Sequence, residues 1–288
     1  MKARAIAAVL ILAILVLPRP GFSLLEQMLE IPAPTPQLKL DLDNECLKYE
    51  VKWSGFRSAE AWVCAERVGQ NYQIKGYART VGFPRTLWRM DDWGLLETRD
   101  DFTLVKYELH DRETFTNLDI FMTFNPGTRV AEIKRVKLGN PDTVKFKQVE
   151  LFQGFDSAGL AALVRTLDWK PGQRRYFEFT DGAERYVILI VAGPIETVQV
   201  GAGSFRAIRL DPYLFRVPRR KGKETPELIQ SIKGLQTWKT IAEYARVWLA
   251  LEGNRPFVLV KGRAFIGEVS LELVDLKAQM PVIPGCGK

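Results

Sequence analysis

FDSAGLAALVRTLDW, residues 155–169, is the best-formed amphipathic helical pattern in a chain that otherwise alternates apolar and polar residues like β-strands. Four apolar residues recur at helical spacing and form a single stripe: Leu160, Leu163, Val164 and Leu167. Asp156 or Ser157 can cap the first turn, and Lys170-Pro171-Gly172 ends the helix. Because a lone helix must cover its apolar stripe, the pattern predicts a helix packed on a sheet.

Segments of alternating polarity lie on both sides of this helix, and Leu47–Trp53 is among the clearest. About a dozen such strands are too many for one flat sheet. We therefore expect a mainly β fold, in which a large curved antiparallel sheet (a barrel or half-barrel) holds one main central helix. One or two short helices are expected at residues 82–88 and 227–235. A slip of the apolar phase between Phe146 and Val149 predicts a bulge.

The first hairpin suggests a disulfide. The register that places the apolar residues of both strands on one face pairs Val51 with Ala59 through a turn at residues 54–56. The same register sets Cys46 directly opposite Cys64, within disulfide range. We therefore expect a disulfide between these cysteines in an oxidising compartment, and the alternative is a pair of reduced, partly buried thiols.

The first residues have the pattern of a secretory signal peptide. Lys2 and Arg4 precede an uninterrupted apolar run at residues 5–17, and small residues follow, which predicts cleavage after Ser23. An uncleaved anchor is the weaker alternative, because the run is short for a bilayer. The chain then divides into a signal peptide, a Pro-rich linker, a single β-rich domain and a flexible tail: 1–23, 24–43, 44–280 and 281–288.

Charge and hydropathy restrict the partners. The chain holds 41 Lys and Arg residues against 34 Asp and Glu residues, a net charge of +7. This mild excess does not by itself indicate nucleic acid, and export makes that partner less favoured still. No stretch after the signal is long and apolar enough for a transmembrane helix, so the processed protein is not expected to span a membrane.

Patterns that carry catalysis or bind metals are missing from the sequence. His110 is the only histidine, and its place on the polar side of an alternating strand predicts an exposed residue rather than a general base. There is no Gly-x-Ser-x-Gly elbow, and there is no Cys-x-x-Cys or His/Cys cluster for zinc. Asp91-Asp92 and Asp100-Asp101 sit at strand ends, where turn roles are commoner than glycosidic catalysis. We expect a protein without enzymatic activity, metal or cofactor.

Two features remain as binding candidates. The first is a loop of positive charge that can meet anionic lipid head groups or an acidic partner, or can simply be solvated: Arg216, Arg219, Arg220, Lys221 and Lys223. The second is a set of tryptophans that can line an apolar ligand cavity, or can equally fill the interior: Trp53, Trp88, Trp93, Trp169 and Trp248.

Short motifs spread over residues 46–276 resemble one known family. In chain order they are LKYEVKWSG at 47–55, DSAGL at 156–160 with Arg165, Pro171-Gly172, Gly203-Ser204-Phe205 before Asp211-Pro212, and Arg255-Pro256 followed by Gly267. Together they resemble the bacterial exported family known as domain of unknown function 3108. The resemblance implies a β-rich curved sheet, a periplasmic location and no assigned reaction. By analogy, that shape is similar to the half-barrel of periplasmic lipoprotein carriers, which shelters acyl chains.

These observations favour a non-catalytic periplasmic protein that binds or carries an apolar or amphipathic envelope component, such as a lipid. The alternative is a structural or interaction module that binds an envelope protein and has a packed interior. An apolar cavity on the order of several hundred Å³ would favour a ligand, whereas native packing density would favour the module.

Overall fold

The computed structural model describes residues 35–139, 143–216, 245–263 and 267–283. Within these ranges lie two helices, α2 (Gly82–Leu87) and α3 (Ser157–Thr166). The strands are β1 (Glu45–Trp53), β2 (Phe56–Val68), β3 (Asn71–Thr80), β4 (Asp91–Thr98), β5 (Leu104–Arg112), β6 (Asn117–Asn125), β7 (Val130–Lys137), β8 (Lys145–Glu150), β9 (Arg174–Thr180), β10 (Arg185–Val200), β11 (Gly203–Arg216), β12 (Arg246–Ala250), β13 (Phe257–Arg263) and β14 (Glu268–Asp275).

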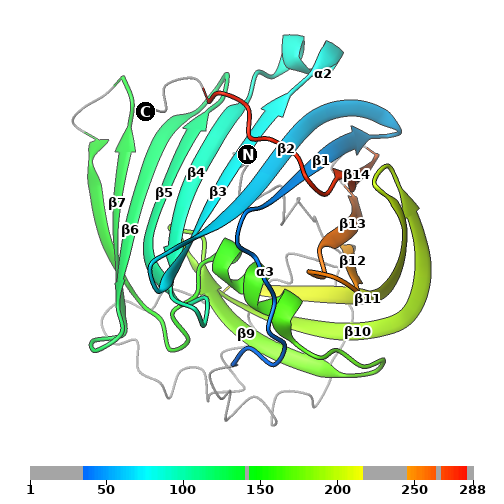
Figure 1. Cartoon of the computed structure of the whole chain (residues 1–288). Coiled ribbons are helices and arrows are strands. Elements are labelled where there is room, and N and C mark those ends of the chain that lie inside the picture. The colour runs from blue at the N-terminus through cyan, green and yellow to red at the C-terminus, as the bar shows by residue number, and fades with distance from the viewer. Residues whose placement is uncertain (1–34, 140–142, 217–244, 264–266, 284–288) are drawn as a thin grey trace, which may run out of the picture.

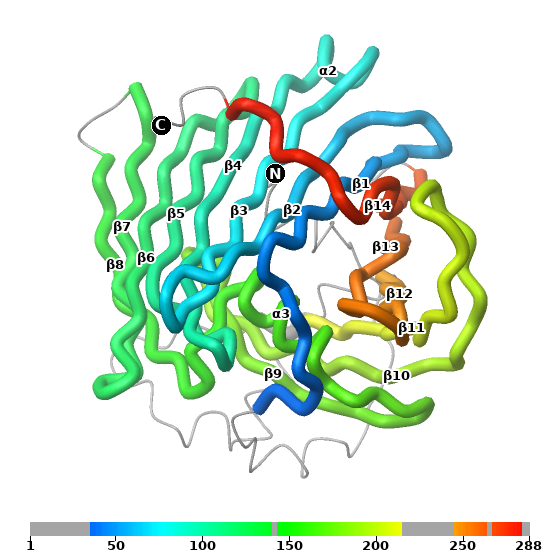
Figure 2. The backbone as a smooth tube through the Cα atoms, viewed as in Figure 1, coloured from blue at the N-terminus to red at the C-terminus, as the bar shows by residue number. Residues whose placement is uncertain are grey.

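All the strands belong to one antiparallel sheet of 14 strands, in the order β8-β7-β6-β5-β4-β3-β2-β1-β14-β13-β12-β11-β10-β9. Neighbours in the sheet are neighbours in the chain, except where β1 pairs with β14. Figure 1 and Figure 2 show the sheet curling round so that α3 lies within its curve. The predicted large, curved antiparallel sheet around one main helix is therefore confirmed.

Asp156 begins α3 as its cap. The Asp156 carboxylate accepts hydrogen bonds from the backbone N–H groups of Ala158 (3.2 Å) and Gly159 (2.9 Å), two donors that the first turn of a helix leaves unpaired. An added Cβ at Gly159 would lie 2.6 Å from the Phe102 carbonyl oxygen, so glycine allows the helix to approach the β4–β5 turn. The predicted apolar stripe is buried in the core: Leu160, Leu163, Val164 and Leu167.

The sheet has two edges, β8 and β9, and side chains join them across a seam. The Glu178 carboxylate accepts the backbone N–H groups of Phe152 (2.6 Å) and Gln153 (3.1 Å), and the Gln153 side-chain oxygen accepts the Glu178 N–H (2.8 Å). Arg185 forms a buried ion pair with Glu178. We call these four residues the β8–β9 seam. They join the two edges together with one backbone hydrogen bond, from the Thr180 N–H to the Phe155 carbonyl oxygen (3.1 Å).

The buried apolar side chains form two clusters. The larger surrounds α3 and takes residues from β2 to β13, among them Phe155, Leu163 and Phe177. The smaller joins β1 and β2 to β10–β14 and includes Leu47 and Leu271. The interior is thus divided between two packed regions, and their junction is where a cavity forms.

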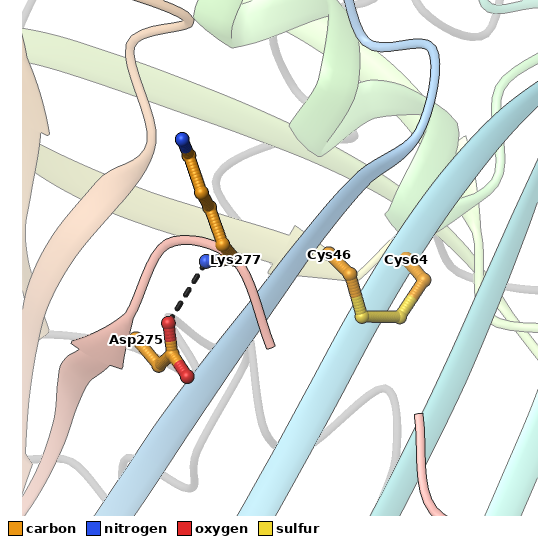
Figure 3. The surroundings of a disulfide bond; sticks show 4 residues. All are labelled: Cys46, Cys64, Asp275 and Lys277. Atoms are coloured by element: carbon orange, nitrogen blue, oxygen red, sulfur yellow. Dashed lines mark hydrogen bonds between the residues drawn. A yellow bond between two sulfur atoms is a disulfide. The ribbon is translucent and has the colours of Figure 1, made fainter. Parts of the chain in front are cut away.

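The register of the first hairpin is the predicted one. Val51 pairs with Ala59, and Cys46 lies directly opposite Cys64. The two cysteines form a disulfide, which Figure 3 shows beside the end of β14. Alternation of apolar residues was sufficient to predict this register, because a shift by one residue would place the apolar residues of the two strands on opposite faces.

The turn of that hairpin is tighter than the predicted turn at residues 54–56. Trp53 pairs directly with Phe56, which leaves a turn of two residues. The register then shifts through a bulge at Ser58, whose hydroxyl donates to the Val51 carbonyl oxygen (3.1 Å). The bulge supplies the extra residue that the longer turn was expected to hold.

The bulge predicted between Phe146 and Val149 is wrong. β7 and β8 pair in one unbroken register. The apolar phase slips because Phe146 is 77% exposed whereas Val149 is buried, so the two residues serve opposite faces. The short helix predicted at residues 82–88 is α2, and the one predicted at 227–235 lies outside the described residues.

The described part of the predicted linker packs on the domain. Leu42 is buried, and the Gln37 side-chain oxygen accepts the Asp168 N–H (2.9 Å) and the Arg175 guanidinium (3.0 Å). Residues 35–43 therefore lie against the end of α3 rather than apart from it. The predicted signal peptide, the first part of the linker and residues 284–288 of the tail lie outside the described residues.

Candidate functional site

A cavity of about 110 Å³ lies between α3 and the inner face of the sheet, at the junction of the two apolar clusters. β1–β4 supply most of its walls, and Leu42 of the N-terminal segment closes part of it. The lining is predominantly apolar. This apolar space is the feature of the described residues that most resembles a ligand site.

Small residues create the cavity because they face each other across it. On α3 they are Ala158, Ala161 and Ala162; on the sheet they are Ala61, Ala65, Gly76, Ala78 and Gly94. A Cβ added at Gly76 would meet nothing within 4 Å, so that position is open space. At Gly94 an added Cβ would lie 2.9 Å from the Glu108 carbonyl oxygen, so the backbones themselves require glycine there.

One buried ion pair stands at the cavity wall. The Arg165 guanidinium of α3 donates to both carboxylate oxygens of Glu45 in β1, at 2.7 Å each. It also donates to the carbonyl oxygens of Asn254 (2.5 Å) and Arg255 (3.1 Å) in the β12–β13 turn. Because these bonds use all three of its nitrogens, Arg165 fastens the helix to the sheet and has little left for a ligand.

Tyr49 is one of the further polar residues of the cavity wall, with Tyr77, Tyr107 and Ser157. Burial raises the pKa of the Tyr49 hydroxyl well above its usual range, although the positive charge of Arg165 acts in the opposite direction. The phenol therefore stays neutral across the physiological range, as a hydrogen-bond donor and acceptor at one side of an apolar space. Such a group can orient the polar end of an amphipathic molecule.

Arg255 complements Arg165 at the same, C-terminal end of the helix. Its guanidinium donates to the carbonyl oxygen of Leu167 (2.8 Å), which ends α3, and to that of Ala250 (3.4 Å). Both arginines are buried. They belong to the short motifs noted in the sequence, together with the cap Asp156, and their roles are to hold the helix in place.

The five candidate tryptophans do not gather around this cavity. Trp53 is exposed at the β1–β2 turn, and Trp88 follows α2 and packs on the smaller cluster. Trp169 is buried in the larger cluster and Trp248 in the smaller. The Trp93 ring stacks on the His110 ring of the neighbouring strand β5. None of them lines the cavity, because their strands place them on different faces and at different ends of the sheet.

Trp62 is the tryptophan that lines the cavity, and sequence reasoning missed it. His110 is half-buried rather than exposed as predicted. Its ring stacks on Trp93 with 3.8 Å between centroids, and its Nδ1 lies 2.8 Å from an Asp119 carboxylate oxygen. The aromatic neighbour opposite His110 on β4 covers the ring, and alternation within one strand could not reveal that neighbour.

The basic loop lies largely outside the described residues. Arg216 ends β11, and Arg219, Arg220, Lys221 and Lys223 follow it within the undescribed segment 217–244. Its binding role stays a prediction.

Buried carboxyls mark a second unusual place, on β4 and β5. Asp92 is completely buried and lies opposite Asp111, and Glu113 follows directly after the end of β5. Burial, with repulsion from the neighbouring acids, raises the pKa of Asp92 to about 8 and that of Glu113 to about 7. Within the described ranges, no group of three or more His, Cys, Asp or Glu side chains is placed to hold a metal ion.

Comparison with known proteins identifies the family of the chain. A family model described as "Protein of unknown function (DUF3108)" matches residues 48–274. No curated protein matches the sequence. Among the helices of the described residues, none is both long and apolar enough to cross a membrane.

Solved structures with a similar fold exist despite very low sequence identity. A β-barrel-like protein of the domain of unknown function DUF1849 from Brucella abortus superimposes with a TM-score of 0.51 at 7% identity, covering 82% of this chain and 98% of that one. A candidate exported protein with a YmcC-like fold from Bacteroides fragilis gives a TM-score of 0.33 at 8% identity, covering 84% and 98%. The first likeness supports the β-barrel-like fold alone.

Proposed function

The chain belongs to the DUF3108 family, and from its cavity we propose that it is a non-catalytic periplasmic protein that binds or carries an apolar or amphipathic component of the cell envelope. The observation that carries the proposal is the apolar space at the junction of two otherwise packed clusters. Facing glycines and alanines keep that space open where larger residues would fill it.

The size of the cavity restricts the ligand. A volume of about 110 Å³ falls short of the several hundred Å³ expected of a site for a whole ligand, and it is somewhat below the engineered cavity of about 150 Å³ that binds benzene in another protein. The space therefore suits one short alkyl segment or ring, with Tyr49 beside it to meet a polar group. A larger lipid would place only part of its chain here, unless α3 and residues 35–43 shifted away from the sheet.

A periplasmic location is supported by two independent features. The signal-like pattern of residues 1–23 favours export, and the Cys46–Cys64 disulfide is of a kind that persists in oxidising compartments.

The cavity can be tested by filling it. Gly76→Leu places a side chain in the open space, whereas Gln73→Leu adds the same side chain to the opposite face of β3. We expect native mass spectrometry of the wild-type protein, purified from its own host, to show a bound small amphiphile. Gln73→Leu should keep that ligand and Gly76→Leu should lose it. A clean apo mass, with no binding of a hydrophobic dye, would contradict the proposal.

A packed structural module is the second candidate, and a specific observation favours it. The arginines and the cap residue of the family motifs hold α3 on the sheet and leave few free polar groups at the cavity. In that case Gly76→Leu would stabilise the fold and leave function intact, and one envelope protein would co-purify in fixed stoichiometry.

A further inference from the structure

One end of the sheet carries a series of exposed aromatic side chains. Because the first eight strands run up and down in order, the β1–β2, β3–β4, β5–β6 and β7–β8 turns all lie at this end. They present the aromatic rim, which we define as Trp53, Phe56, Phe83, Leu87, Phe115 and Phe146. Figure 1 shows α2 and the β1–β2 turn projecting beyond the sheet here. Four of these side chains, all phenylalanines, are between 73% and 81% exposed.

Hydrogen bonds between neighbouring turns make the aromatic rim continuous. The Val81 N–H, which precedes α2, donates to the Ser58 carbonyl oxygen of β2 (2.9 Å). The Thr114 N–H of the β5–β6 turn donates to the Arg89 carbonyl oxygen after α2 (2.9 Å). The turns therefore hold their aromatic side chains on one rigid edge.

The opposite end of the same strands is polar. Its β2–β3, β4–β5 and β6–β7 turns contain residues 69–70, 99–103 and 126–129, which are rich in Gly, Asp, Thr and Arg. Val68 is the exposed large apolar residue at that end. Of the exposed aromatic side chains in the described ranges, Tyr213 alone lies outside the rim. Chance exposure of single residues would not be confined to one end.

The exposed charge of the rim is mainly positive. Along the described part of the arc from the β1–β2 turn to the β7–β8 turn, the exposed charged side chains are Arg57, Arg89, Lys137 and Lys145. Asp91 and Glu113 beside Arg89, and Glu60 beside Arg57, are mostly or fully buried. Glu268, whose carbonyl oxygen accepts the Ser54 N–H of the β1–β2 turn, is an exposed acid at one end of the rim. The edge therefore presents aromatic groups flanked mainly by cations.

We propose that the aromatic rim docks on a bilayer surface that carries anionic phospholipid head groups. Aromatic side chains prefer the boundary between head groups and acyl chains, and Lys and Arg are attracted to the negative surface. The apolar side chains are distributed in small groups along the rim, from the β1–β2 turn and α2 to Phe115 and Phe146, rather than gathered in one continuous patch. A fluid bilayer can take up such side chains individually, because its lipids rearrange around each of them.

Vesicle co-sedimentation of the protein, expressed as the full chain and purified as the host processes it, tests the proposal. The wild type should bind phosphatidylcholine vesicles that contain phosphatidylglycerol and should bind pure phosphatidylcholine much more weakly. The triple variant Phe56→Ser/Phe83→Ser/Phe115→Ser should lower the partition coefficient about tenfold for each ring removed. Val68→Ser, an exposed apolar residue at the opposite end, should change nothing.

Charge is tested separately. Lys137→Gln/Lys145→Gln should lower binding to anionic vesicles about fivefold per charge. Lys170→Gln, an exposed lysine between α3 and β9, is the control and should leave binding unchanged. Circular dichroism must confirm that each variant folds, and the single Phe115→Ser variant replaces the triple one if that is unstable.

The outcomes separate this proposal from others. Failure of the wild type to bind anionic vesicles, or equal binding by the triple variant, would overturn it. It would also fall if the rim substitutions altered the oligomeric state or the capture of one protein partner while vesicles were ignored. Gly76→Leu should bind vesicles like the wild type, so a failure of the cavity proposal leaves this test intact.

Discussion

At the scale of single residues, Asp92 shows how burial sets a charge state. Its side chain is completely buried, one carboxylate oxygen accepts the Arg112 N–H (2.7 Å), and the other has no hydrogen-bond partner. With a pKa of about 8, the carboxyl holds its proton in the folded protein at neutral pH, whereas the unfolded chain releases it above about pH 4. Asp91, the next residue, has the opposite behaviour, because Arg85 and Arg89 lower its pKa although partial burial opposes them.

This contrast predicts opposite pH dependences for two neighbouring substitutions. The folded pKa of Asp92 is raised, so its cost to stability grows as pH rises from about 4 to 8. Asp92→Asn removes that cost and should raise the melting temperature at pH 8 far more than at pH 4. The folded pKa of Asp91 is lowered, so its contribution is present at neutral pH and is lost in acid. Asp91→Asn should destabilise at pH 7 and not at pH 3.

Thermal unfolding between pH 3 and pH 9 measures both effects. At about 2–4 °C per kcal/mol for a domain of this size, the differences are well within reach of calorimetry. Parallel pH profiles for wild type and Asp92→Asn would show that the buried carboxyl is not protonated as described.

At the scale of elements, the alternation of apolar residues predicted the strands and the helix well, but it could not predict the cavity. The β1–β2 register and the capped helix followed from the spacing of apolar residues, because a period of two or of 3.6 is a property of one segment. The cavity depends on glycines and alanines of β2–β4 facing alanines of α3, and no single segment contains that information. The same reason explains why His110 was expected to be exposed: its covering ring, Trp93, belongs to another strand.

The β1–β2 hairpin also predicts a stabilising role for its disulfide. Cys46 and Cys64 are separated by 18 residues, and closing a loop of that length in the unfolded chain is worth about 3 kcal/mol in the entropic account. Cys46→Ser/Cys64→Ser should lower the free energy of unfolding by roughly that amount. Denaturant unfolding with and without reductant measures the loss in the wild type, and the double variant should be insensitive to reductant. Cys286→Ser is the matched control and should behave like the wild type.

At the scale of the whole molecule, the fold depends on how a sheet of 14 strands ends. An open edge exposes unpaired N–H and C=O groups and invites association. In this protein the edges β8 and β9 meet at the β8–β9 seam, where the Glu178 carboxylate stands in for backbone acceptors. Desolvation raises the pKa of Glu178, and the charge of Arg185 opposes that shift. Arg185 thus keeps in place an acceptor that the seam requires.

From the seam we predict that removing Arg185 will weaken the contacts between the edges β8 and β9 before the rest of the sheet is affected. Arg185→Met keeps much of the volume but leaves the buried Glu178 without its counter-charge, a change that typically costs about 3–5 kcal/mol. Hydrogen exchange should accelerate first at the amides of Phe152 and Gln153, which donate to that carboxylate, because they lose their acceptor before the rest of the sheet unfolds.

Two further variants decide whether the seam acts as described. Arg174→Met removes an exposed arginine from β9, the edge strand that carries Glu178. It should leave hydrogen exchange at Phe152 and Gln153 unchanged. Adding Glu178→Gln to Arg185→Met removes the stranded charge but keeps one oxygen acceptor, so it should recover part of the lost stability. If Arg185→Met lowered stability with exchange rising evenly over all strands, the pair would support the fold generally, and closure would have to come from the packing around α3 instead.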